Sequence, residues 1–232
     1  MAGMDDALPV AYRPILVTGL PRSGTSLIAG CLERCGAFVG RCVEPTPENP
    51  KGFFENAFLR DEIDKRLLRA LHADPRGVDP LPALAEVPGI RGLERVVLEA
   101  LRIEGYDGRR PWLFKDAKLT LLWPAWATAF PAARWVIVRR REEDVVRSCL
   151  RTGFMRRRSG DPRFWRLFCR AYLDRLERLK ASGAWWREIW PGGLVGGDLA
   201  PIERLCADLG LEPAREAIRR FVAPEHWHAP AG

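Results

Sequence analysis

Residues 14–27 constrain the fold of this chain more than any other part of its sequence. An apolar run after residue 14 ends at Gly19, and a segment with Pro21 and Gly24 leads into a second apolar pattern. This pattern predicts a strand, a tight loop and a helix in succession. Glycines let a backbone approach an anion closely, and the first turn of a helix offers unpaired N–H groups and its positive dipole end. An oxyanion-binding loop is therefore predicted here.

Gly19 and Gly24 have the spacing of a Walker A loop, but Thr25 stands where nucleotide kinases and ATPases place Lys. The cation of the loop is Arg22 instead. This argues against ordinary γ-phosphoryl transfer and favours a loop that holds a terminal phosphate while Arg22 faces the reacting group. The residues predicted to bind the phosphate are Ser23, Gly24, Thr25 and Ser26.

Residues 21–26 resemble the loop with which the sulfotransferase family binds 3′-phosphoadenosine 5′-phosphosulfate (PAPS), Pro-Lys/Arg-Ser/Gly-Gly-Thr, and are closest to its tyrosylprotein sulfotransferase branch. Residues 49–55 resemble the Asn-Pro-x-Gly-Phe-x-Glu signature of bacterial sulfotransferase-like proteins. The resemblance implies an α/β fold: a P-loop-like, three-layer structure with a central, mainly parallel β-sheet flanked by helices.

A second strand, turn and helix is predicted around residues 134–150. An apolar strand over 134–138 is followed by a charged turn and a helix from Val145, with Asp144 as the N-cap. In sulfotransferases the corresponding turn holds the 3′-phosphate through an Arg and a Ser eight positions later, which implies these roles for Arg140 and Ser148. ATP has no 3′-phosphate, so this second site favours PAPS over ATP.

The short apolar strand after Pro111 ends at Lys115 and Asp116. Groups just beyond the carboxyl ends of parallel strands line the ligand crevice of open α/β sheets, so both side chains are placed to act. The segment resembles the Lys-Asp-Pro-Arg/Phe segment of sulfotransferases, although Ala117 replaces the proline. A solvated Lys–Asp ion pair is the alternative reading.

Helices are predicted over residues 57–71, 93–103, 119–129, 162–180, 201–209 and 212–221, with Leu167 on the apolar face of the fourth. Residues 194–199 resemble the late strand and Tyr-Glu-Asp-Leu turn before the final helix of sulfotransferases, which implies a strand here. The Pro-rich stretch 74–92 and the basic stretch 152–161 are predicted to be loops. Adenine could stack on Trp185, Trp186 or Trp190, although packing is the commoner role of tryptophan.

The chain has 232 residues, which predicts one domain with a disordered N-terminus of about 1–12 and a tail of about 224–232. Its net charge of +7 and pI near 9.4 fit a small, strongly anionic ligand without requiring nucleic acid. No signal segment or membrane span is evident, and the six cysteines show no ligand spacing. A cytoplasmic protein with reduced thiols is predicted, and its Ala- and Arg-rich composition suggests a bacterial source.

The resemblance implies transfer of a sulfuryl group from PAPS to an acceptor hydroxyl or amine, with release of adenosine 3′,5′-bisphosphate (PAP) and no metal. Arg22 and Lys115 would stabilise the transferred charge. Glu44 is the first candidate for the general base, Glu55 the second, and His72 a more remote one. Each of these carboxylates could instead cap a helix or pair with Arg.

Two other functions remain open. A P-loop kinase would require Mg²⁺ and a Lys at position 25, and a non-catalytic nucleotide-binding protein would keep both anion sites without turnover. The acceptor is expected to be a small molecule, a lipid or a carbohydrate. Its binding pocket is expected to be shaped by the loops 42–55, 74–92 and 153–162, whose sequences do not indicate which acceptor it binds. No pattern in the sequence sets the oligomeric state.

Overall fold

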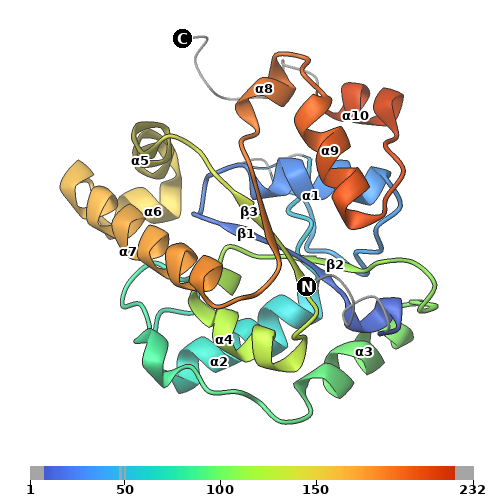
Figure 1. Cartoon of the computed structure of the whole chain (residues 1–232). Helices are drawn as coiled ribbons and strands as arrows, with labels where there is room; N and C mark the ends of the chain where they lie inside the picture. Colours follow the sequence, from blue (N-terminus) through green and yellow to red (C-terminus); the bar gives the residue numbers. More distant parts are fainter. Residues whose placement is uncertain (1–7, 47–48, 50, 223–232) are drawn as a thin grey trace.

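A four-stranded parallel sheet forms the centre of the protein in a computed structural model that describes residues 8–46, 49 and 51–222 (Figure 1). Its strands are β1 (Ile15–Gly19), β2 (Leu113–Lys115), β3 (Arg134–Val138) and β4 (Trp186–Ile189), arranged in the order β2-β1-β3-β4. The register pairs Ile15 with both Leu113 and Arg134, so β1 lies between two strands that follow it by about 100 residues or more in the chain.

Alternate residues of the strands belong to two separate hydrophobic cores. Leu16, Phe114 and Trp135 face one core, whereas Val17 and Val136 face the other. The first core is covered by α2 (Lys65–Ala70), α3 (Leu93–Ile103), α4 (Leu119–Ala129), α5 (Glu142–Arg151), α6 (Gly153–Arg158) and α7 (Pro162–Ala181). The second is covered by α1 (Thr25–Arg34), α8 (Gly192–Val195), α9 (Ala200–Leu209) and α10 (Arg215–Val222), which lie above the strands in Figure 1. The predicted three-layer α/β fold with a parallel sheet is confirmed.

The helices predicted over residues 93–103 and 119–129 are α3 and α4, with the predicted bounds. In α3, Leu93, Val97 and Leu101 recur at intervals of four residues and are all buried. In α4, seven of the eleven residues are buried because the helix packs between the sheet and α7. Helices with such strong apolar periodicity are determined by their local sequence, which is why the sequence alone predicts their bounds.

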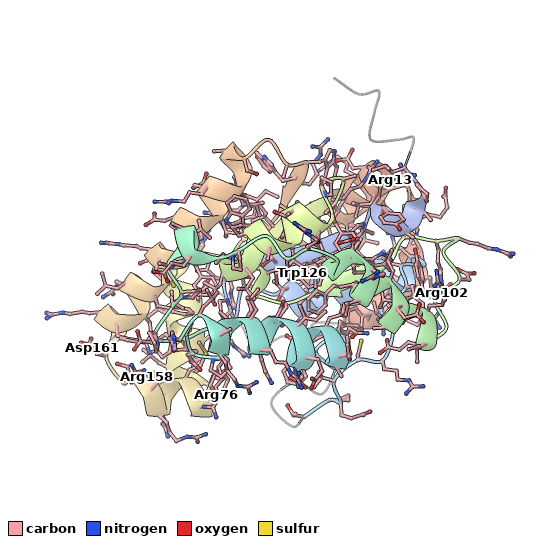
Figure 2. The ribbon with its side chains drawn as sticks, turned by 90° about the horizontal axis from the view of Figure 1, so that it is seen from below. Arg13, Arg76, Arg102, Trp126, Arg158 and Asp161 are labelled. Atoms are coloured by element: carbon pink, nitrogen blue, oxygen red, sulfur yellow. The ribbon has the colours of Figure 1, made fainter. Side chains whose placement is uncertain are left out.

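The helix predicted over 57–71 contains a π-helical segment, Leu59–Asp64, before it continues as α2. The wider turn brings Asp64 to the buried side, where its exposed fraction is zero. Its Oδ1 accepts a hydrogen bond of 2.9 Å from the indole N–H of Trp126, which lies at the centre of the molecule in Figure 2.

Three predicted segments differ in the structure. The basic stretch 152–161 was predicted to be a loop but contains α6, which Met155 anchors in the core with no exposed surface. The late strand is Trp186–Ile189, not 194–199, where the glycines allow only the short helix α8 before a turn. Val10–Tyr12 form a 3₁₀ helix, although the N-terminus was predicted to be disordered to about residue 12. The remainder of the two predicted disordered termini lies outside the described residues, apart from Leu8 and Pro9.

Candidate functional site

The predicted phosphate loop runs from the end of β1 to the start of α1. Gly24 is the N-cap of α1 and has φ 100°, a left-handed conformation that favours glycine. Gly19 closes against the neighbouring strand, because a Cβ at this position would lie 2.4 Å from the carbonyl oxygen of Val138. The loop therefore depends on glycine at both ends and leads directly into the N-terminus of a ten-residue helix.

Ser23 provides an independent sign that this loop is built for a ligand. The residue has no exposed surface, and its hydroxyl has no hydrogen-bond partner among the described residues. Buried hydroxyls are normally paired, because leaving one unpaired costs about 1–3 kcal/mol. A phosphate oxygen held by this loop would satisfy the hydroxyl, so the residues present fit the 5′-phosphate group of the expected nucleotide.

Arg22 joins the first anion loop to the second. Its backbone has φ 73°, an uncommon conformation for a residue with a side chain, and its Nε donates a hydrogen bond of 3.0 Å to the hydroxyl of Ser148 in α5. Arg140, just after β3, donates from Nη1 to the carbonyl oxygen of Arg22 at 3.1 Å. Residues 22, 140 and 148, which were predicted from two separate motifs, therefore lie in contact.

The charge of this cluster is positive. The pKa of Arg140 lies below its usual value, because burial and the repulsion of Arg22 and Arg147 outweigh the attraction of Asp144. The prediction that Asp144 is the N-cap of α5 is wrong. The helix begins at Glu142 with Arg141 as the N-cap, and Asp144 forms an ion pair with Arg147 at 3.2 Å. The prediction failed because three acidic residues follow one another there and any of them could begin a helix.

Lys115, at the end of β2, forms an ion pair with Glu55. Its Nζ lies 2.7 Å from Glu55 Oε1, and only 3% of the lysine side chain is exposed. Burial alone would raise the pKa of Glu55, but Lys115 and Lys118 outweigh it and hold that pKa below the usual value. Arg60 lies 3.7 Å from the other carboxylate oxygen. Glu55 is therefore a carboxylate held among cations.

Contacts along α1 position Glu55 beside the sheet. The Ser26 hydroxyl donates to the carbonyl oxygen of Phe53 at 3.3 Å, which ties the first turn of α1 to the segment before Glu55. Phe54 packs edge-on against Phe221 with ring centroids 5.7 Å apart. Gly30 allows this close approach, because a Cβ there would lie 2.3 Å from the Phe221 ring.

A second buried set of charges lies behind Lys115. Lys118 lies 2.6 Å from Asp116, and both are almost fully buried. Burial raises the pKa of Asp116 although Lys118 opposes the rise, and the pKa of Asp64 is raised well above its usual value by burial and then by the charge of Asp116. Lys118 thus compensates buried carboxylates, while Lys115 pairs with Glu55 on the adjacent segment.

Sequence reasoning missed Asp64, Arg60 and the pair Thr18–Thr120. The two threonine hydroxyls lie 2.9 Å apart below the phosphate loop, and that of Thr120 also lies 3.3 Å from the carbonyl oxygen of Gly19. A signal was present for the threonines and for Asp64: both threonines interrupt buried apolar segments, and Asp64 is four residues before the buried Leu68. Polar residues at such positions are normally paired.

Other predicted residues lie apart from these contacts. Glu44 and His72 are exposed, and within the described chain no side-chain hydrogen bond or ion pair connects either to the cluster. Trp185 and Trp186 are partly covered and lie beside Arg187 and Lys180, respectively. Trp190, just after β4, is 49% exposed.

The described helices include none that is long and apolar enough to span a membrane. The described cysteines are all unpaired thiols.

Comparisons with known proteins agree with this architecture. The chain resembles the sulfotransferase domain of the Synechococcus PCC 7002 olefin synthase, with a TM-score of 0.60 and 14% identity over 95% of this chain and 90% of that one. It also resembles sulfotransferase STF9 from Mycobacterium avium, with a TM-score of 0.53 and 15% identity over 98% and 70% of the two chains. At these identities the likeness shows the fold. A sequence search of curated proteins finds no match.

The evidence for the family is the match of a family model that spans most of the chain. The model of the sulfotransferase family matches residues 14–212, from the residue before β1 into the loop after α9. The matched range contains the phosphate loop, the Lys115–Glu55 pair and the Arg140–Ser148 turn described above. The chain belongs to the sulfotransferase family, whose enzymes take the sulfuryl group from PAPS.

Proposed function

We propose that this sulfotransferase uses residues 22–26, Lys115, Arg140 and Ser148 to bind PAPS and transfer its sulfuryl group to a hydroxyl or amine of a small-molecule, lipid or carbohydrate acceptor in the cytoplasm. The observation that carries the assignment is the contact between the two anion loops, in which Arg22 Nε lies 3.0 Å from Ser148 Oγ. One nucleotide with phosphates at both its 5′ and 3′ positions can engage both loops. PAPS supplies the activated sulfuryl group, and PAP is the product.

The 5′-phosphate would be held by the backbone of residues 23–26 and by the unpaired Ser23 hydroxyl. The amides of the first turn of a helix lack intrahelical acceptors, and the helix dipole favours an anion at that end. The buried threonine pair behind Gly19 stiffens the loop, since it holds the loop's first carbonyl in place. Such preorganised donors stabilise developing charge without having to reorient during the reaction.

Arg140 and Ser148 would hold the 3′-phosphate. Arg140 offers a planar guanidinium that can make paired hydrogen bonds to phosphate oxygens, and Ser148 offers a hydroxyl donor. The half-buried position of Arg140 strengthens its attraction for the 3′-phosphate, because a cation withdrawn from water interacts more strongly with an anion. This dedicated site would discriminate PAP from 5′-AMP and ATP.

Arg22 and Lys115 would stabilise charge on the group in transfer, so that these side chains supply the positive charge that a metal ion supplies in many phosphoryl transfers. For the base that accepts the acceptor's proton we propose Glu55, because it contacts Lys115, with Glu44 as the alternative. A carboxylate whose pKa is held low is ionised at neutral pH and can accept a proton only transiently.

Titration calorimetry in EDTA tests the nucleotide assignment. The wild type should bind PAP at least tenfold more tightly than 5′-AMP or MgATP, and Arg140→Ala should abolish the preference for PAP over 5′-AMP. The matched control is Arg141→Ala, which removes the adjacent exposed arginine and should leave the preference intact. Equal affinity for PAP and 5′-AMP, or tighter binding of MgATP, would refute the assignment.

A further inference from the structure

The end of α6 and the first half of α7 carry a concentration of exposed arginines, which we call the α6–α7 basic face. Its members are Arg156, Arg157, Arg158, Arg163, Arg166 and Arg170. In α7, positions 163, 166 and 170 follow the spacing of one helix side, and the two helices are held together where Trp165 Nε1 donates to the Ser159 carbonyl oxygen at 2.9 Å. The Arg158 guanidinium also lies 5.9 Å from the centre of the Phe164 ring, so the end of α6 and the start of α7 are in direct contact.

This positive charge is hardly neutralised by the protein itself. Between residues 156 and 170 the only acidic side chain is Asp161, which serves as the N-cap of α7 by accepting from the Arg163 amide at 2.8 Å. Arg158 pairs with Asp79, and the other five arginines have no carboxylate partner in the part of the chain that the structure describes. Arg158 and Asp161 lie at one edge of the molecule in Figure 2, far from Arg102 on α3.

Leu167 lies in the middle of this arginine stripe. The helical pattern predicted it to be buried, yet 64% of its surface is exposed, because α7 turns Trp165, Phe168 and Tyr172 toward the core instead. A second apolar side chain, Phe154 of α6, is 36% exposed and lies 5.9 Å from the Arg76 guanidinium. The surface thus combines uncompensated cations with outward apolar side chains.

We propose that the α6–α7 basic face docks the protein on a membrane surface that contains anionic lipids. Arginines attract the phosphate groups of such lipids, and an apolar side chain gains free energy when it enters the boundary between headgroups and acyl chains. A polysaccharide or a nucleic acid would satisfy the arginines but would give Leu167 nothing to enter. The combination of both features therefore favours a lipid surface over a soluble polyanion.

The face is connected to the nucleotide site through α5. Thr152 ends α5 and precedes α6, and its hydroxyl donates to the Ser148 carbonyl oxygen at 2.9 Å. Asp79 and Arg76 connect the face to the loop 74–92, which is expected to shape the acceptor pocket. Docking through this face would therefore bring the loop 74–92 close to the lipid surface.

Co-sedimentation with vesicles in the absence of nucleotide tests the docking. At low salt, the protein should bind vesicles of phosphatidylcholine with 30 mol % phosphatidylglycerol and should not bind phosphatidylcholine alone. Each arginine near such a surface contributes about a fivefold factor, so removing three should lower the partition coefficient roughly 100-fold. The test variant is Arg163→Gln/Arg166→Gln/Arg170→Gln. The control of equal net charge is Arg69→Gln/Arg91→Gln/Arg109→Gln, at exposed arginines outside the face.

Leu167→Ser separates a lipid surface from other polyanions. Loss of its insertion should lower vesicle binding about tenfold and leave the retention on a heparin column unchanged. The proposal is refuted if no vesicle binding is found, if the control triple loses as much binding as the test triple, or if Leu167→Ser binds vesicles like the wild type. PAP calorimetry on the triple variant should match the wild type, so a failure of docking and a failure of the nucleotide assignment are distinguishable.

Discussion

Replacement of Lys115 by Met should leave the buried carboxylate of Glu55 without its main ion-pair partner. The two groups lie 2.7 Å apart, with 3% and 14% of their side chains exposed. Removing one partner of a buried pair costs about 3–5 kcal/mol. Because Arg60 remains 3.7 Å from Glu55, we expect the lower end, a loss of about 3 kcal/mol in the free energy of unfolding at pH 7.

The double variant Glu55→Gln/Lys115→Met removes both charges and keeps similar volume. A buried pair replaced by uncharged groups often costs little, so about 2 kcal/mol of the loss should return, which corresponds to about 4–8 °C in Tm. Lys65→Met is the control, because its pair with Asp61 has a similar distance of 2.6 Å but is more exposed, at 25% and 38%. That variant should lose less than about 1 kcal/mol.

The pH dependence provides the sharper test. In the wild type the pKa of Glu55 is held low, so the pair stabilises the fold above the unfolded pKa of about 4.3, and this contribution is lost as pH falls through the folded pKa. In Lys115→Met the unpaired carboxyl can take up a proton, so its deficit relative to the double variant should shrink between pH 7 and pH 5. Urea unfolding of all four proteins at both pH values measures this. Equal midpoints for the single and double variants at pH 7, or a deficit that grows on acidification, would refute the reasoning.

Three further results are expected. Gly19→Ala should destabilise the protein more than Gly36→Ala by about 1–3 kcal/mol in urea unfolding, because both have positive φ but only Gly19 would place a Cβ against a backbone carbonyl; equal losses would contradict this. Ser148→Ala should weaken PAP binding about tenfold by calorimetry, since Arg22 and the nucleotide both lose a hydroxyl partner, and an unchanged affinity would exclude Ser148 from the site. The raised pKa of Asp64 means that this group makes the fold less stable as pH rises from about 3.9 to its folded pKa, so Asp64→Asn should remove that slope from the unfolding free energy; a slope that persists would assign it to another group.

The parts of the fold that the sequence predicts are those decided by local patterns. The phosphate loop, α3 and α4 have their periodicity, glycines and caps within a dozen residues. The roles predicted for Arg140 and Ser148 follow from the resemblance to the sulfotransferase turn, which also lies within a short stretch of sequence. That these two motifs meet could be expected, because the carboxyl ends of parallel strands share one edge of a sheet. The direct contact of Arg22 with Ser148 depends on the unusual backbone at Arg22, which no pattern announces.

The failures have tertiary causes. Residues 153–158 form a helix because the Met155 side chain is buried in the core, although Gly153 and a run of arginines suggest a loop. Leu167 is exposed because the larger Trp165 and Phe168 decide which side of α7 is buried. The inward position of Asp64 follows from a π-helical turn, which shifts the helix register in a way that periodicity alone does not reveal.

The strand order also determines when the phosphate loop can form during synthesis. β1 is translated first, but the strands that flank it, β2 and β3, are translated much later, and the hydrogen bond from Thr18 to the Asp116 carbonyl oxygen needs a residue 98 positions further along the chain. At about 5–20 residues per second, the ribosome needs roughly 5–20 s to cover that distance. For this interval, until β2 is made, the nascent chain carries an apolar strand with both edges unpaired, which is the form that chaperones would bind. Nucleotide can stabilise only a chain whose synthesis is already well advanced.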